Sequence, residues 1–330
     1  MSATISPHEP DQRHQPELSV DLVALASAGD ILGISRLLAK HAPWPLNSLS
    51  LALGRAAGNG HAECVKLLIP LSDPKAYDSV ALMAAARNGR AECVALLIPV
   101  SDPKTQSSLA LAWAAENGHA DCVKLLIPAC DPTAEESSAL RIAANNGHAE
   151  CVRLLLPWST PLAGQSAALR LAASNGHAEC VKLLAPFSEF SGSGLPLALA
   201  AQGGHAECVK ILIPLSNPKF DNSRALRWAA QGGHAECAKL LLPVSNRLAE
   251  CDEILLSVLE NGHANVAALL LDYEPLLLDG ANLLEAELSA RAQGHPELAA
   301  LLSSIIEQRA LTESVPAHQR PRSPPIGGRL

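Results

Sequence analysis

One twelve-residue stretch recurs along most of the chain and constrains its fold more than any other feature. It reads Asn-Gly-His-Ala-Glu-Cys-Val-Lys-Leu-Leu-Ile-Pro at residues 59–70, and its turn glycine returns as Gly89, Gly118, Gly147, Gly176, Gly204, Gly233 and Gly262. The spacing is 29 residues, with one interval of 28. A fixed period of about 20 to 50 residues is typical of a solenoid, in which similar units stack on one another. We therefore expect one elongated repeat body.

Each unit is predicted to hold two helices joined by a glycine turn. In the unit from Ser79 to Pro99, Leu82 and Ala85 fall on one face of a first helix over residues 80–88, with Ser79 as its N-cap. The turn glycine ends this helix because it adopts the left-handed conformation at little cost. A second helix follows, and the proline stops it. The fold class is therefore predicted to be all-α.

The connector after each proline is predicted to be a loop, because proline disfavours a central strand and favours a turn. One apolar residue follows the proline in each unit, and it is Trp158 in one unit and Phe187 in the next. We predict that these two aromatic side chains anchor their loops on the core.

The composition fits a core of small and aliphatic side chains. Hydrophobic residues make up 48% of the chain, but aromatic residues only 3%. Seven of the nine cysteines hold the same place in successive units: Cys64, Cys93, Cys122, Cys151, Cys180, Cys208 and Cys237. Stacked helices lie about 8–10 Å apart, whereas a disulfide needs Cα atoms within about 7 Å. We expect reduced, buried cysteines in this ladder.

Charge and hydropathy narrow the class of partner. The net charge of −8 and the pI near 5.8 argue against a nucleic-acid surface, which needs a basic face. The first twenty residues show no apolar signal run, and no stretch approaches 18 uninterrupted apolar residues. The sequence predicts a soluble, cytoplasmic protein, a monomer that binds no nucleic acid and no membrane.

Three regions are expected along the chain. Residues 1–18 are polar and rich in proline and histidine, and residues 307–330 contain several prolines and arginines; both are predicted to be disordered. Residues 19–306 are predicted to form the solenoid, with diverged capping units at both ends.

The string Ala-Ala-x-Asn-Gly-His-Ala-Glu-Cys-Val-Lys-Leu-Leu, as at residues 114–126, resembles the helix–turn–helix core of the ankyrin repeat. The resemblance covers about residues 19–305. The family's Thr-Pro-Leu-His opening is absent, and the unit is about four residues shorter than the usual 33. The resemblance therefore implies ankyrin-like helix pairs with short, mostly strandless connectors.

The repeated His and Cys, such as His61 and Cys64, are both metal-ligand types and stand three residues apart. A redox- or metal-responsive protein is therefore an alternative, as is a reactive thiol at Cys130 or Cys251, which stand outside the ladder. The competing interpretation places His at the turn, bonded to main chain, and Cys in the core. It is favoured because the pair is copied in almost every unit, whereas a catalytic pair is normally singular. Pairs in neighbouring units also lie about 10 Å apart, too far to complete one metal site with ligand bonds of about 2 Å. No cofactor or metal is expected.

The residues that vary between units indicate function. In the ankyrin family, the two positions before the turn glycine contact partner proteins, and the resemblance assigns that role to Arg87, Asn88, Glu116, Asn117, Asn145, Ser174, Gln202 and Gln231. The loop residues just before the first helix vary as well, and the predicted partner-binding set therefore also includes Tyr77, Gln106, Glu135 and Phe220. The chain is thus predicted to be a non-enzymatic protein-interaction scaffold that binds its partner on a concave face. Its Ala-, Leu- and Arg-rich composition suggests a bacterial protein, and delivery into a host cell as an effector is a further hypothesis.

Overall fold

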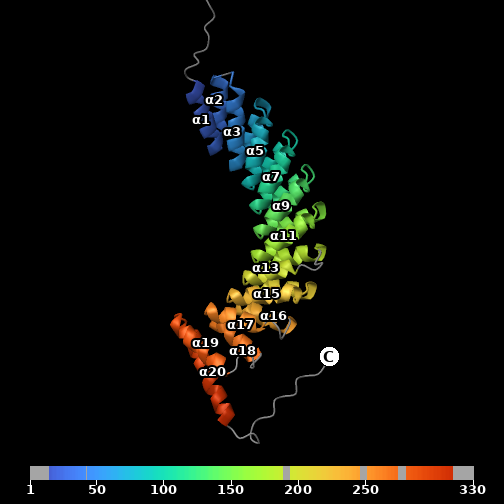
Figure 1. Cartoon of the computed structure of the whole chain (residues 1–330). Helices are drawn as coiled ribbons and strands as arrows, with labels where there is room; N and C mark the ends of the chain where they lie inside the picture. Colours follow the sequence, from blue (N-terminus) through green and yellow to red (C-terminus); the bar gives the residue numbers. More distant parts are fainter. Residues whose placement is uncertain (1–14, 42, 189–193, 246–250, 274–279, 315–330) are drawn as a thin grey trace, which may run out of the picture. The chain divides into compact units, whose positions relative to one another are not determined.

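The computed structural model describes residues 15–41, 43–188, 194–245, 251–273 and 280–314. Helices dominate these residues, and no strand occurs among them. The chain divides into two compact units, Met1–Glu189 and Phe190–Leu330, and each is a stack of helix pairs (Figure 1). The predicted all-α repeat solenoid with strandless connectors is therefore confirmed over the part of the chain that the structure describes.

The first unit contains six helix pairs, in which the odd-numbered helix comes first. The elements are α1 (Gln15–Ala28), α2 (Ile31–Lys40), α3 (Leu46–Asn59), α4 (Ala62–Leu68), η1 (Ile69–Leu71), α5 (Ala76–Arg87), α6 (Ala91–Leu97), α7 (Thr105–Glu116), α8 (Ala120–Leu126), α9 (Ala134–Asn145), α10 (Ala149–Leu155), η2 (Leu156–Trp158), α11 (Ala163–Ser174), α12 (Ala178–Leu184) and η3 (Ala185–Phe187).

The second unit contains four helix pairs, and its last pair is the longest. The elements are α13 (Leu195–Gln202), α14 (Ala206–Leu212), η4 (Ile213–Leu215), α15 (Phe220–Gln231), α16 (Ala235–Leu241), η5 (Leu242–Val244), α17 (Cys251–Glu260), α18 (Ala264–Tyr273), α19 (Gly280–Ala292) and α20 (Pro296–Ser314). None of the described helices is both long and apolar enough to cross a membrane.

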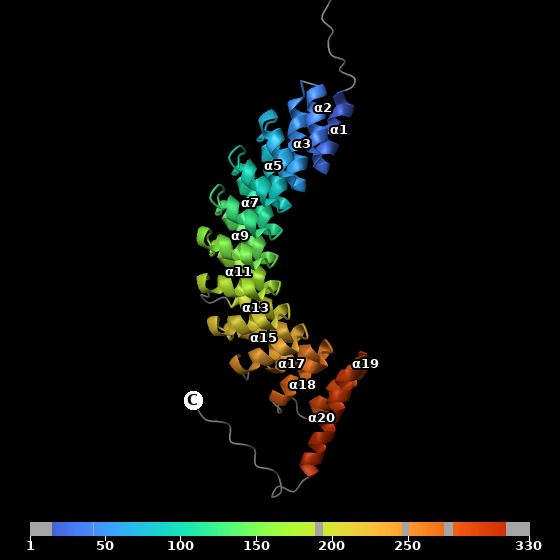
Figure 2. The same cartoon turned by 180° about the vertical axis from the view of Figure 1, so that it is seen from behind.

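Each unit has two layers of helices. First helices pack against first helices, as α5 does on α3 and α7, and second helices pack against second helices, as α6 does on α4 and α8. Figures 1 and 2 show this stacking from opposite sides. The leucine, valine and cysteine of the second helices from α4 to α14 and the paired alanines of the first helices from α3 to α15 are buried between the layers. Examples are Val123, Leu126, Ala114 and Ala115, all 0% exposed.

The glycine turn is locked by the histidine of the next repeat. At Gly147 φ is +77°, and a Cβ there would lie 2.5 Å from Nδ1 of His177. The same ring donates from Nε2 to the main-chain oxygen of Asn145, at 2.9 Å. Equivalent bonds join His119 to Arg87 and His234 to Gln202. The histidine therefore ties one repeat to the preceding one, as the structural interpretation predicted.

Several first helices begin with an unusual left-handed turn. In α5, Tyr77, Asp78 and Ser79 have φ of 52°, 57° and 61°, so the right-handed helix starts at residue 80. Equivalent turns open α7, α9 and α11. Residues with side chains adopt this conformation at a cost of about 1–2 kcal/mol each. Contacts to the next repeat must offset this cost.

A buried serine at the end of the turn supplies one of these contacts in α5, α7 and α9. Ser79 Oγ accepts a hydrogen bond from the main-chain N–H of Asp102, at 2.9 Å, and Ser108 and Ser137 bond the next repeat's loop in the same way. The prediction that Ser79 serves as an N-cap therefore needs correction, because its hydroxyl accepts from the neighbouring loop.

The predicted role of two aromatic residues is wrong. Trp158 and Phe187 are 61% and 54% exposed, so they do not anchor their loops on the core. The reason is local: each closes a short 3-10 turn after the second helix, and this turn carries the side chain outward. The anchor in this part of the unit is instead the loop serine or its replacement, as where Cys130 Sγ contacts the main-chain oxygen of Pro103, at 3.2 Å.

The helices reach beyond the predicted limits of the solenoid. α1 begins at Gln15 and α20 ends at Ser314. Residues 1–14 and 315–330, where disorder is expected, lie outside the described residues, and the division into 1–18, 19–306 and 307–330 stays a prediction.

Candidate functional site

The right-handed part of each first helix exposes one side that is built from the same positions in every repeat. Residues at i, i+4 and i+7 share a side of a helix, so Val80, Ala84 and Arg87 of α5 lie in line. We call this surface the first-helix face; in the first unit it is formed by α5, α7, α9 and α11, and in the second unit by α13 and α15. Its middle row is Ala84, Trp113, Ile142, Leu171, Leu199 and Trp228, and its outer row is Arg87, Glu116, Asn145, Ser174, Gln202 and Gln231.

The middle row is apolar in all six helices, and each of its side chains is half-buried. The outer row is polar, and its Arg87, Glu116, Gln202 and Gln231 are exposed. A partly accessible apolar stripe beside a polar one is the arrangement of a protein interface, with an apolar centre and a polar rim.

Two tryptophans occupy the same repeat position and each lies beneath an arginine. The guanidinium carbon of Arg87 lies 5.5 Å from the ring centroid of Trp113, and that of Arg224 lies 5.5 Å from the ring of Trp228. Such cation–π contacts hold both side chains in place. Trp and Arg are also the residue types most enriched where protein interfaces derive most of their affinity.

The structure separates the predicted site residues into three groups. The outer row of the first-helix face contains six of them. Asn88 and Asn117 are exposed but their amides bond main chain, since Nδ2 of Asn88 donates to the oxygen of Gly58 at 3.0 Å and Nδ2 of Asn117 to that of Trp113 at 2.9 Å. These two asparagines therefore have a structural role beside any contact with a partner.

The third group lies at the opposite end of the first helices. Tyr77, Gln106 and Glu135 are exposed on the left-handed turns, and Phe220 is half-buried at the start of α15. Gln106 Nε2 donates to the Asp78 carboxylate of the preceding repeat, at 2.8 Å. At 1.5 Å per residue, the eight right-handed residues between the turns and the outer row span about 12 Å. The middle row connects the two groups.

Trp113 and Trp228 are absent from the sequence-based set, although they lie between its two groups. A regularity in the sequence could have pointed to them. Both stand five residues before a turn glycine, at a position where the apolar residue type changes between units. They were missed because the sequence shows only that an apolar residue recurs there, which is equally consistent with a core position.

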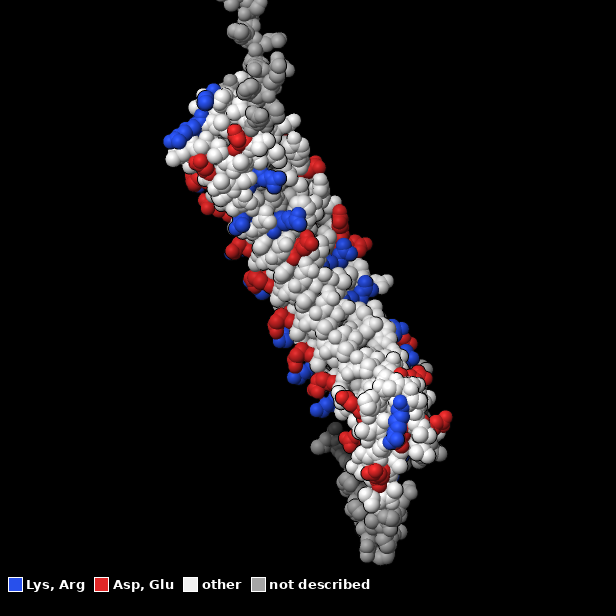
Figure 3. All heavy atoms as spheres, turned by 90° about the vertical axis from the view of Figure 1, so that its left-hand side faces the viewer, with Lys and Arg blue, Asp and Glu red and all other residues white. Residues whose placement is uncertain are grey.

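The second helices present a different surface, on which charges neutralise one another. Glu63 and Lys66 pair at 2.6 Å, as do Glu179 and Lys182, and Glu150 pairs with Arg153 in the same spacing. In Figure 3, Lys and Arg alternate with Asp and Glu along one edge of the molecule, while most of the middle of this view carries no charge. Exposed pairs of this kind contribute about 0–1 kcal/mol each.

The cysteine ladder lies in the core. Burial, with a smaller contribution from the neighbouring Asp121 carboxylate at Cys122, raises the pKa of the Cys122, Cys151, Cys208 and Cys237 thiols to about 11. Burial likewise raises the pKa of Cys130 to about 11. No group of three His, Cys, Asp or Glu side chains suited to a metal ion occurs among the described residues. The thiols are therefore protonated near neutral pH, which disfavours the redox alternative; the side chain of Cys251 lies outside the described residues.

These buried thiols should resist alkylation in the folded protein. The thiolate is the reactive form, so iodoacetamide at pH 7.5 is expected to leave the eight buried cysteines unmodified, whereas all nine cysteines react after unfolding in guanidinium. Unfolded thiols deprotonate near pH 9, whereas five buried ones, Cys122, Cys130, Cys151, Cys208 and Cys237, deprotonate near pH 11. The free energy of unfolding should therefore also fall as pH rises through this window. Mass spectrometry of tryptic peptides reads the labelling, and rapid native labelling of Cys122 or Cys151 would contradict the assignment.

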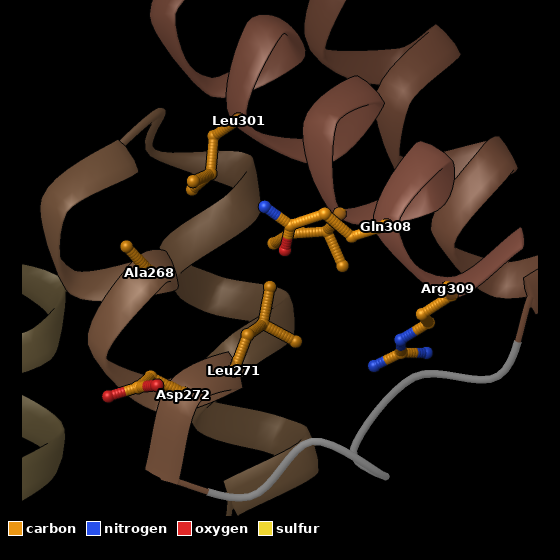
Figure 4. A pocket seen from close by; sticks show the side chains of 7 residues that line it. Ala268, Leu271, Asp272, Leu301, Gln308 and Arg309 are labelled. Carbon is orange, nitrogen blue, oxygen red and sulfur yellow. The ribbon is translucent and has the colours of Figure 1, made fainter. Parts of the chain in front are cut away.

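A groove of about 350 Å³ lies in the second unit between α18 and α20. Figure 4 shows Leu271 and Leu301 pointing into it, with Asp272 and Arg309 on opposite sides. The groove contains none of the predicted site residues. We assign it no role.

Together, the stacked helix pairs and the first-helix face define a helical repeat protein with an extended surface. The sequence matches the family model for ankyrin repeats, described as three copies, in overlapping windows that run from residue 22 to residue 252: 22–107, 53–136, 82–163, 111–193, 140–219 and 169–252. The chain belongs to the ankyrin repeat family. Ankyrin repeats are generally modules for protein–protein interaction, and typically they are scaffolds rather than enzymes.

A solved structure is also similar. The crystal structure of the human ASB11 ankyrin repeat domain is 22% identical, covers 52% of this chain and 95% of its own, and superposes with a TM-score of 0.44. A search of curated proteins found no match.

Proposed function

We propose that the protein is a non-enzymatic interaction scaffold that binds a partner protein on the first-helix face, which would form the concave side of its stack. The observation that carries this proposal is the apolar middle row, with Trp113 and Trp228 at equivalent positions, each beneath an arginine. A surface of this kind offers apolar area and fixed charges along successive repeats, without requiring a deep pocket.

The polar outer row supplies the second part of the proposal. Its residues differ from repeat to repeat while the turn glycine and the second helix stay nearly the same. A constant frame with a variable polar row beside an apolar stripe suits recognition of one particular partner, because the rim contacts set the register.

An affinity pull-down read by mass spectrometry tests the proposal. The variant changes Arg87, Glu116, Gln202 and Gln231 to Ala; all four are exposed, so each change should alter stability by about 0.5 kcal/mol or less. We expect the partner to be captured by the wild type and lost from the folded variant. A matched control changes Lys66, Lys124, Lys182 and Lys210 of the second helices to Ala and should retain the partner. Equal retention by the first-helix variant would refute the assigned face.

Delivery into a host cell is a separate part of the proposal. It is supported by the Ala-, Leu- and Arg-rich composition and by the polar residues 1–18. A translocation reporter fused to residues 1–50 tests it in a secretion-competent bacterial strain, and absence of reporter from host cells would count against delivery.

A further inference from the structure

The first-helix face of the first unit differs in charge from the rest of that unit. The right-handed parts of α5, α7, α9 and α11, together with α3, which packs beside α5, contain four arginines, Arg55, Arg87, Arg141 and Arg170, and a single acidic residue, Glu116. The whole chain has a net charge of −8. These helix segments therefore carry more positive than negative charge on an acidic protein.

These arginines are not neutralised by ion pairs. Among the described residues, none of the four has a carboxylate within salt-bridge distance, whereas basic residues of the second helices, such as Lys66, Arg153 and Lys182, pair with a glutamate three residues earlier. The guanidinium of Arg141 instead donates to the main-chain oxygen of Glu135, at 3.0 Å, and that of Arg87 lies over Trp113. Arg55 and Arg87 thus have no ion-pair partner among the described residues.

Acidic side chains do occur at one margin. Asp78, Glu135 and Glu136 lie on the left-handed turns at the start of the first helices, and Asp78 accepts a hydrogen bond from Gln106. Exposed Arg55 and Arg87 lie away from these turns, Arg55 in register with the middle row and Arg87 in the outer row. A bound segment would meet its positive counterparts over the middle and outer rows.

We propose that the first unit binds an acidic, apolar polypeptide segment of a partner protein along this face. Apolar side chains of the segment would cover Trp113, Ile142 and Leu171, and its carboxylates would pair with Arg55 and Arg87. A guanidinium held over a tryptophan keeps its donors in one plane, which suits a carboxylate that accepts two hydrogen bonds. This inference rests on the proposed function, because it names the chemistry of the partner at the same face.

Panning a phage-displayed library of random 16-residue peptides on the full chain tests the inference. We expect the enriched peptides to carry net negative charge and several Leu, Ile or Phe residues. A synthetic peptide of the leading sequence should bind at least about tenfold more weakly to the double variant Arg55→Glu, Arg87→Glu, because attraction becomes repulsion. Trp113→Ala should also weaken it. The double variant Lys66→Glu, Lys124→Glu makes the same charge change on second helices and should bind as the wild type does.

The outcomes separate this inference from the proposed function. Enriched peptides that are neutral or basic, but that lose affinity for Trp113→Ala, would overturn the acidic partner and leave the binding face intact. Peptides that bind Trp113→Ala and the double arginine variant as tightly as they bind the wild type would overturn the binding face itself. Absence of any enriched peptide would overturn the acidic segment as the ligand. Circular dichroism of each variant shows that it is folded as the wild type is.

Discussion

Replacing Gly233 by Ala is expected to destabilise the second unit by about 2–4 kcal/mol. The residue has φ of +71°, which costs a side chain about 1–2 kcal/mol. Its new Cβ would also lie 2.6 Å from Nδ1 of His263. The ring must then move, and it would lose the hydrogen bond from Nε2 to the main-chain oxygen of Gln231, now 2.9 Å, worth about 1 kcal/mol. Urea denaturation followed by circular dichroism measures the loss.

Gly294 provides a matched control for this substitution. It has a similar φ, +81°, but nothing lies within 4 Å of a Cβ placed there. Gly294→Ala should therefore cost only the conformational share, about 1–2 kcal/mol. In a His263→Ala background the cost of Gly233→Ala should fall to the same level. Equal losses for the two glycines in the wild-type background would show that the histidine does not lock the turn.

The second large effect is expected at the core of the second helices. Leu155 of α10 is 0% exposed between the two helix layers. Leu155→Ala should destabilise the first unit by about 2–5 kcal/mol, because it removes buried apolar surface and leaves a cavity. The midpoint of urea unfolding and hydrogen exchange of the neighbouring repeats report the change.

Trp158 serves as the comparison, three residues further along the chain. The Trp158 side chain is 61% exposed. Trp158→Ala should therefore lower the free energy of unfolding by less than about 1 kcal/mol, although it removes a larger side chain than Leu155→Ala does. A loss at Trp158 as large as that at Leu155 would restore the interpretation that this aromatic residue anchors its loop, and would contradict its exposed position.

The sequence was sufficient for the repeat frame because each part of it obeys a local rule. The turn glycine predicts the end of the first helix, the proline predicts the end of the second, and apolar residues at helical spacing predict the helices themselves. The same three signals recur in successive units with a period of 29 residues. A second helix accordingly follows the turn glycine, as α6 (Ala91–Leu97) follows Gly89. The bonds from turn histidines such as His177 to the preceding repeat also agree with the predicted structural interpretation.

Features that depend on the neighbouring repeat could not be predicted in the same way. Tyr77, Asp78 and Ser79 adopt a left-handed turn that their side chains disfavour, and the buried bond from Asp102 to Ser79 exists only after the repeats have stacked. The outward direction of Trp158 likewise depends on a 3-10 turn that its apolar character does not reveal. Local preference was overruled by tertiary contacts in these places.

Of the candidate face, the polar outer row was predicted from the sequence, but the two tryptophans of the middle row were not. Its outer row, such as Arg87 and Gln231, varies in polar type between repeats and so attracts attention. Trp113 and Trp228 were missed because an apolar residue at a recurring position suggests core, and only the structure places them on the accessible side of the first helices.

Hydroxyl-radical footprinting of the protein with and without its captured partner tests the central claim most directly. Trp113 and Trp228 lie on the proposed face, whereas Trp158 and Phe187 are exposed elsewhere and serve as internal controls within the same sample. We predict that the partner lowers oxidation of Trp113, Trp228 or both, and leaves Trp158 and Phe187 unchanged. Protection of Trp158 and Phe187 with unchanged oxidation of Trp113 and Trp228 would contradict the account and place the binding surface on the connectors.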